Sequence, residues 1–94
     1  MDGSDRQAAL QALLTPEELD LLARADSLSA RERAVFVLLG RGHRPKSIAF
    51  ELAVSPTTVE THVARVRAKL GGEHPVEFAD LVFLARLWVR AHGV

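Results

Sequence analysis

The sequence predicts an all-α fold, a small helical bundle forming one domain. Helix start signals recur along the chain: a Ser or Thr precedes several apolar runs, with Pro or Glu placed to complete the first turn. No stretch of useful length alternates apolar and polar residues as a half-buried strand does. With 94 residues, 48% of them hydrophobic, the chain suits one core, and we expect no separate sensor domain beside it.

Two short helices are expected in the N-terminal part. A Ser and a Gln at capping-box spacing predict a helix over residues 4–14. The run Thr15-Pro16-Glu17-Glu18 is a stronger signal, because it offers a capping hydroxyl and a proline that lacks the N–H left unpaired at the first helical position. The helix that this run begins is expected to end near Ala25.

Four further helices follow. Ser29 and Glu32 form a second capping box, and the helix that they begin is expected to end at Leu39, before the glycines of Gly40-Arg41-Gly42. Proline starts and glycine stops predict the other three helices, over residues 45–52, 56–70 and 76–92.

Residues 46–70 have helix-turn-helix spacing, since only residues 53–55 separate a short helix from a longer one. The longer helix has an apolar stripe of Val59, Val63, Val66 and Leu70. Small side chains lie opposite, at Thr57, Thr61, Ala64 and Ala68. Such a face suits the major groove of DNA, and hydroxyls at the helix start suit a phosphate, although ordinary three-helix packing would give the same spacing.

The charges are unevenly distributed. Residues 1–28 hold six acidic and two basic side chains, whereas residues 29–75 hold eight basic and four acidic ones. A basic middle segment suits a polyanion, and it is equally compatible with an ordinary solvated surface.

Residues 28–71 resemble the LuxR/GerE-type helix-turn-helix of bacterial transcription regulators. The resemblance is carried by Leu28-Ser29-Ala30-Arg31-Glu32-Arg33, Val35, Leu38, Gly42, Lys46, Ile48-Ala49, Leu52, Val54-Ser55-Pro56, Thr58-Val59, Thr61-His62 and Lys69-Leu70-Gly71. It implies a DNA-binding domain over residues 28–94, preceded by a helical extension over residues 1–27. Sigma-factor region 4 shares part of this pattern, but the Thr58-Val59-x-x-His62 spacing is closer to LuxR.

The resemblance also assigns roles to residues. The recognition helix is 56–70, and the base-contacting positions fall on Glu60, Thr61 and Ala64. Phosphate contacts are expected from Thr57, Thr58, His62, Arg65 and Lys69. Glu60 and Ala64 depart from the basic or polar residues common in the family, and Ser47 stands where the family usually has Glu.

The helix 76–92 is apolar nearly all round, and such a helix is normally buried. We therefore expect a homodimer joined through Leu81, Leu84, Ala85 and Trp88, in keeping with the family's use of its last helix. Alternatively, the N-terminal helices cover the spare face. A related expectation is that residues 6–25 cover Val37 and Phe50, which point away from the core faces of their own helices.

The partners expected are double-stranded DNA and a second copy of the chain, with regulation through abundance or a protein partner. No catalytic set, metal-ligand spacing or cofactor motif stands out, and cysteine is absent, so we expect neither an enzyme nor a metal or cofactor. The sequence shows no membrane span and no signal peptide, which predicts a cytoplasmic protein. The alternative function is a protein-interaction module that binds another regulator or an RNA polymerase subunit; the acidic N-terminal part and Glu60 favour it.

Overall fold

The computed structural model describes residues 15–94, which form helices and no strand. The helices are α2 (Pro16–Ala23), the 3₁₀ helix η1 (Arg24–Ser27), α3 (Ala30–Gly40), α4 (Pro45–Leu52), α5 (Pro56–Gly71) and α6 (Phe78–His92). The predicted all-α class is confirmed, and α3 to α6 begin and end within two residues of the expected positions. The helix predicted over residues 4–14 lies outside the described residues.

The described residues contain two capping boxes, one at the predicted N-cap Thr15 and one at the predicted pair Ser29 and Glu32. The Thr15 hydroxyl accepts the Glu18 N–H at 3.1 Å, and the Glu18 carboxylate accepts the Thr15 N–H at 3.1 Å. Ser29 and Glu32 make the same exchange at 3.2 and 2.9 Å. Each pair satisfies two N–H groups that a helix start would otherwise leave unpaired, so the chain fixes these boundaries locally.

The helix predicted to end near Ala25 is shorter than expected. It tightens into η1 after Ala23, where the Ser27 hydroxyl donates to the Arg24 carbonyl at 2.7 Å. Arg24 then joins this segment to the rest of the domain, because its Nη1 donates to the Leu70 carbonyl at the end of α5 at 3.0 Å. Nη2 of the same guanidinium pairs with Asp20 at 2.8 Å.

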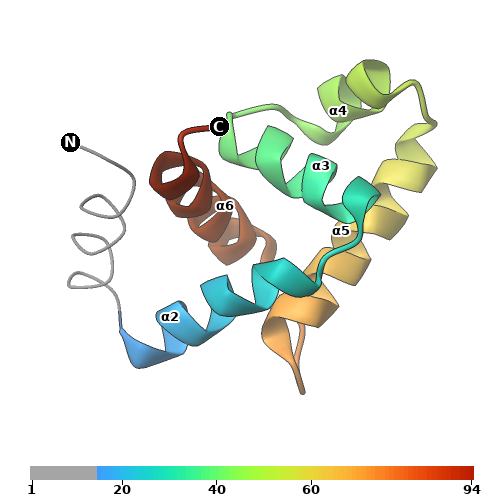
Figure 1. The fold of residues 1–94 in the computed structure, drawn as a ribbon. Coiled ribbons are helices and arrows are strands. Elements are labelled where there is room, and N and C mark those ends of the chain that lie inside the picture. Colours follow the sequence, from blue (N-terminus) through green and yellow to red (C-terminus); the bar gives the residue numbers. More distant parts are fainter. Residues whose placement is uncertain (1–14) are drawn as a thin grey trace.

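Helix α3 is the centre of the domain, with α4, α5 and α6 packed around it (Figure 1). Its contact with α6 is close at Gly40, where an added Cβ would lie 2.6 Å from Val89 Cγ2 and 2.7 Å from the Ala85 carbonyl carbon. The side chains that fill the core come from all these helices and include Val35, Phe36, Leu39, Ile48, Val59, Val66, Leu70 and Leu81.

The prediction that residues 6–25 cover Phe50 is wrong, because this side chain is 85% exposed. Helix α2 packs instead against α5 and α6, at the opposite end of the domain from α4 (Figure 1). Val37 is half-buried and borders a groove between α3 and α4. An apolar residue facing away from its own helix's core stripe was therefore insufficient evidence for an intramolecular partner.

Three of the four predicted dimer residues are also wrong. Leu81, Leu84 and Ala85 are 0%, 2% and 0% exposed within one chain, so none of them is available to a second copy. Trp88 is half-buried, with its ring centroid 5.9 Å from that of Phe36. The spacing of apolar residues predicted an apolar helix, but it did not predict which side of that helix would pack against the core of the same chain.

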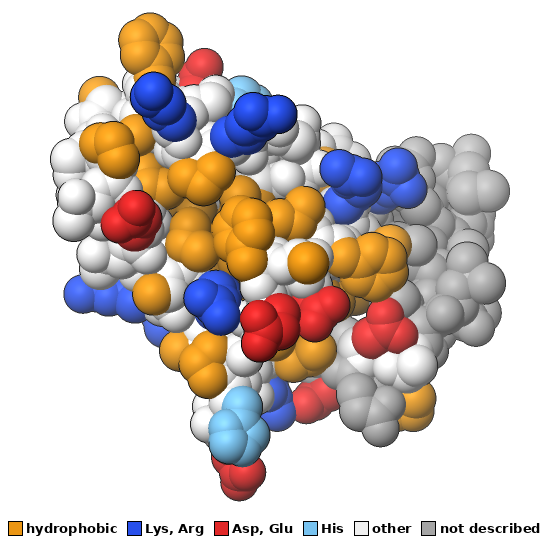
Figure 2. Space-filling model, turned by 180° about the vertical axis from the view of Figure 1, so that it is seen from behind, with side chains coloured by type: hydrophobic (Ala, Val, Ile, Leu, Met, Phe, Trp, Pro, Cys, Tyr) orange, Lys and Arg blue, Asp and Glu red, His pale blue; other side chains and the backbone are white. Residues whose placement is uncertain are grey.

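The large apolar side chains that α6 does leave exposed are Phe78 and Phe83. Hydrophobic side chains also gather across the middle of one face of the whole molecule, with Lys and Arg side chains along its upper edge (Figure 2). No helix within residues 15–94 combines the length and apolar character needed to cross a membrane.

Candidate nucleic-acid interface

The turn between α4 and α5 is built by a left-handed residue and a capping serine. Ala53 has φ 55° and ψ 44°, and its N–H donates to the Phe50 carbonyl at 3.2 Å. The next N–H, of Val54, donates to Ala49 at 3.0 Å, which closes α4. Ser55 then caps α5 by accepting the Thr58 N–H at 3.1 Å. These local bonds set the angle between the two helices and give the motif predicted from spacing.

Helix α5 has the two faces that the sequence predicts. Val59, Val63, Val66 and Leu70 are buried. The opposite face is exposed and consists of Thr57, Glu60, Thr61, Ala64, Arg65 and Ala68. Every predicted base-contacting residue, Glu60, Thr61 and Ala64, therefore lies on one solvent-facing surface. The Thr61 hydroxyl donates to the Thr57 carbonyl at 3.1 Å, which leaves its oxygen lone pairs to accept hydrogen bonds.

The predicted phosphate-contacting residues are less uniform. Arg65 and Thr57 are exposed, whereas Thr58 and His62 are half-buried. The Thr58 hydroxyl lies 2.9 Å from that of Ser55, so it forms part of the helix cap. The Nδ1 atom of His62 is buried and has no hydrogen-bond partner among the described residues, which marks this side of the imidazole as packed inward.

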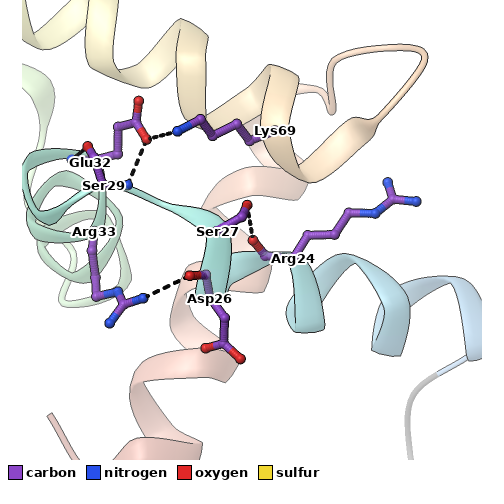
Figure 3. A network of polar contacts seen from close by, with 7 residues as sticks. All are labelled: Arg24, Asp26, Ser27, Ser29, Glu32, Arg33 and Lys69. Carbon is purple, nitrogen blue, oxygen red and sulfur yellow. Dashed lines mark hydrogen bonds and ion pairs between the residues drawn. The ribbon is translucent and has the colours of Figure 1, made fainter.

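Lys69 is engaged with the core. Its Nζ lies 2.6 Å from Oε1 of Glu32, whose side chain is 5% exposed, while the Lys69 side chain is 40% exposed (Figure 3). The pKa of the Glu32 carboxyl is held below its ordinary value, mainly by the hydrogen bond from Lys69 and, to a smaller extent, by the hydrogen bond from the Ser29 N–H. Lys69 thus neutralises a buried carboxylate, and the structure gives it a role that its place in the family pattern did not predict.

Arg67 is similarly engaged. Its Nε donates to the Val76 carbonyl at 2.7 Å, and the Val76 N–H donates to the Arg67 carbonyl at 3.1 Å. This pair of bonds ties α5 to the segment that leads into α6. The second half of α5 carries three cationic side chains. Among them, only that of Arg65 makes neither a hydrogen bond nor an ion pair within residues 15–94.

A second basic surface, not singled out from the sequence, adjoins the start of α4. Arg41, Gly42, His43, Arg44, Lys46 and Ser47 line a shallow hollow of about 550 Å³. Arg44 is the N-cap of α4 and makes no side-chain cap, so the first N–H groups of this helix are not satisfied by its capping residue. Three cations within six residues, next to a proline-started helix, were the signal available in the sequence. Positive side chains beside a helix N-terminus suit a phosphate.

The described residues contain no group of three or more His, Asp and Glu side chains arranged to hold a metal ion. The candidate site lies on the surface of the domain. It combines an exposed helix face, a capped helix start and a neighbouring basic hollow, and together they define a helix-turn-helix domain of the kind that contacts nucleic acid.

The comparison with protein families makes this class specific. The family described as bacterial regulatory proteins, luxR family (GerE), matches residues 26–82, more than half of the chain. The chain belongs to this family.

Similar proteins are transcription regulators by name. The transcriptional regulatory protein UhpA of Escherichia coli K12 is 44% identical over 72 residues, which are 74% of this chain and 37% of UhpA. FixJ of Rhizobium meliloti is 49% identical over 51 residues, 54% of this chain and 25% of FixJ. MalT of Serratia proteamaculans is 40% identical over 65 residues, 69% of this chain and 7% of MalT. The chain thus spans little more than a third of UhpA and less of the others, and no solved structure matches it.

Proposed function

We propose that the protein binds double-stranded DNA as a transcription regulator, with α5 as the helix that enters the major groove. The observation that carries this proposal is the exposed face of α5, whose small central residues Thr57, Thr61 and Ala64 let a helix approach base edges closely. Membership of the luxR family and the names of the relatives support the same function. Such a function places the protein in the cytoplasm, with bacterial DNA.

The family resemblance gives the base-contacting positions, and the chemistry of each side chain indicates which base it would contact. The Glu60 carboxylate would accept from cytosine N4, and the Thr61 oxygen would accept a hydrogen bond while its methyl group contacts an apolar base edge. Ala64 offers a methyl group to thymine. Phosphates would be held by Arg65 and by the start of α5, with the basic hollow before α4 on the adjoining backbone.

Arg65→Ala should weaken duplex binding across all sequences, because a phosphate contact carries no sequence information. The plot of log K against log salt should lose about one unit of slope, as expected for one contact. Fluorescence anisotropy with labelled fragments from a genomic pool, titrated at several salt concentrations, measures this. Arg86→Ala, an exposed arginine of α6, is the matched control and should leave the slope unchanged. Absence of duplex binding by the unaltered protein at low salt would overturn the proposed function.

The proposed assembly is a homodimer joined by the exposed side of α6. Phe78 and Phe83 are 41% and 50% exposed, and burying them between two copies would remove apolar surface from water. A symmetric pair could also place two α5 helices about one DNA turn apart, the spacing of a two-fold site.

Phe83→Glu should shift the protein from dimer to monomer, because a carboxylate in a symmetric apolar contact meets its own copy. Light scattering at micromolar concentration gives the mass directly. Phe50→Glu provides a matched control, since Phe50 is still more exposed but lies on α4. A monomeric mass for the unaltered protein, or a dimer that Phe83→Glu leaves intact, would contradict an interface centred on this residue.

A further inference from the structure

We propose that the groove between α3 and α4 binds an amphipathic helix from another protein, one that carries acidic side chains about two helical turns apart on either side of an apolar stripe. The α3–α4 groove is shallow and open, with a volume of about 440 Å³, and is lined by Ala30, Arg33, Ala34, Val37, Leu38, Arg41, Glu51 and Leu52. This inference does not depend on DNA binding, because the proposed base contacts lie on α5, whereas the groove is lined by α3 and α4.

The floor of the α3–α4 groove is apolar. Val37 and Leu38 are half-buried, and Ala34 beside them is small, so the groove has room for side chains from outside. The core-facing residues Val35, Phe36 and Leu39 lie on the other side of α3, which packs against α5 and α6. Unlike Leu38, Val37 does not pack against the core cluster. A helix fits such a groove by inserting apolar residues spaced three and four apart.

The charges around the groove define the partner's chemistry. Arg33 and Arg41 lie on the same side of α3, eight residues apart, which corresponds to roughly 12 Å along the helix. Both arginine side chains are exposed. Arg33 makes one long hydrogen bond, from Nη2 to the Asp26 carbonyl at 3.4 Å. On the opposite wall of the groove, α4 contributes the acidic side chain of Glu51. These two cations favour a partner helix whose acidic side chains have the same separation along its axis. Basic side chains at those positions of the partner would be repelled.

The groove does not overlap the proposed base-contacting face of α5. The residues that carry the proposed base contacts are on the exposed side of α5, whereas the groove opens on the side of α3 that faces away from α5. Arg41 borders both the groove and the basic hollow. The test therefore alters Val37 and Arg33, which belong to the groove alone.

The probe is a phage-displayed library of amphipathic helices, with fixed leucines at helical spacing and randomised flanking positions, selected on the 94-residue chain. We expect enriched clones to carry Asp or Glu two turns apart. As synthetic peptides they should bind at least tenfold more weakly to Val37→Glu and to Arg33→Glu. Peptides with Glu replaced by Arg at the matching position should regain affinity for Arg33→Glu.

Circular dichroism and duplex binding verify that both variants stay folded, and Arg33→Glu remains informative if the substitution at Val37 disturbs folding. Failure to enrich any helix would overturn the proposal. So would enrichment of basic flanks, or selected peptides that bind the variants as tightly as the unaltered protein. Loss of duplex binding by the unaltered protein would contradict the proposed function while leaving this result to stand on its own.

Discussion

Gly40→Ala should destabilise the protein by about 3 kcal/mol, although the same substitution inside a helix ordinarily stabilises by up to about 1 kcal/mol. The cause is the close approach of α3 and α6, where the new methyl group would meet the Ala85 backbone and the Val89 side chain. Backbone atoms cannot rotate away, so α6 must shift as a whole. Thermal unfolding should show a fall in Tm on the order of 15 °C for a domain of this size.

Gly42→Ala is the matched control for this effect. Gly42 has φ 91° and nothing within 4 Å of an added Cβ, so a methyl group there meets backbone strain but no clash. We expect a loss of about 1–2 kcal/mol from the left-handed conformation alone. A Gly40→Ala variant as stable as the unaltered protein would show that α3 and α6 are not packed as described.

Lys69→Met should cost about 1–3 kcal/mol, because it leaves the buried Glu32 carboxylate without its cation. The estimate lies below that for a fully buried pair, since the Lys69 side chain is 40% exposed and water reaches it. Urea unfolding measures the loss, and Lys46→Met, on the exposed surface of α4, should change stability little. Glu32→Gln keeps the capping geometry while removing the charge, so the double variant with Lys69→Met isolates the coupling between the two residues.

The same pair predicts a pH dependence. Because the folded-state pKa of Glu32 is lowered, its contribution to stability is present above the ordinary value of 4.5 and is lost as the pH falls through the lower folded value. Unfolding free energies measured from neutral to acidic pH should therefore decline more steeply below pH 4.5 in the unaltered protein than in Glu32→Gln. Equal pH profiles would mean that the carboxylate is not held by Lys69 in solution.

Lys69 and Arg65 together separate stability from binding. Both were expected at phosphates, yet one is paired with a core carboxylate and the other has no partner within residues 15–94. Lys69→Met should act on unfolding, and Arg65→Ala on the salt dependence of duplex binding. The distinction arises from tertiary structure, because Glu32 lies 37 positions away in the sequence.

The helix boundaries were predictable because capping residues act over three or four positions. Thr15 with Glu18 and Ser29 with Glu32 bond within their own first turns, and Pro45 and Pro56 mark helix starts by chemistry that needs no partner. The two faces of α5 follow for a similar reason, since a helix repeat fixes which of its side chains share a side.

What could not be predicted depends on contacts between distant segments. The sequence shows that α6 is apolar on several sides, but its buried side was settled by the approach of Gly40, 45 residues before Ala85. Phe50 was expected to have a cover and is exposed, because α2 lies against α5 and α6. The cations beside α4 form a surface only once the α3–α4 loop is folded.

Arg24 has a consequence for where the autonomously folding unit begins. The family match starts at residue 26. The guanidinium of Arg24, which precedes it, donates a hydrogen bond to the Leu70 carbonyl at the end of α5. Its positive charge also interacts favourably with the negative end of the α5 helix dipole. A fragment cut at the family boundary would leave this carbonyl to water, and the last turn of α5 would fray. Its amide hydrogens should then exchange with solvent faster than in the intact chain. In this protein α5 is thus anchored by a residue that precedes the matched family region.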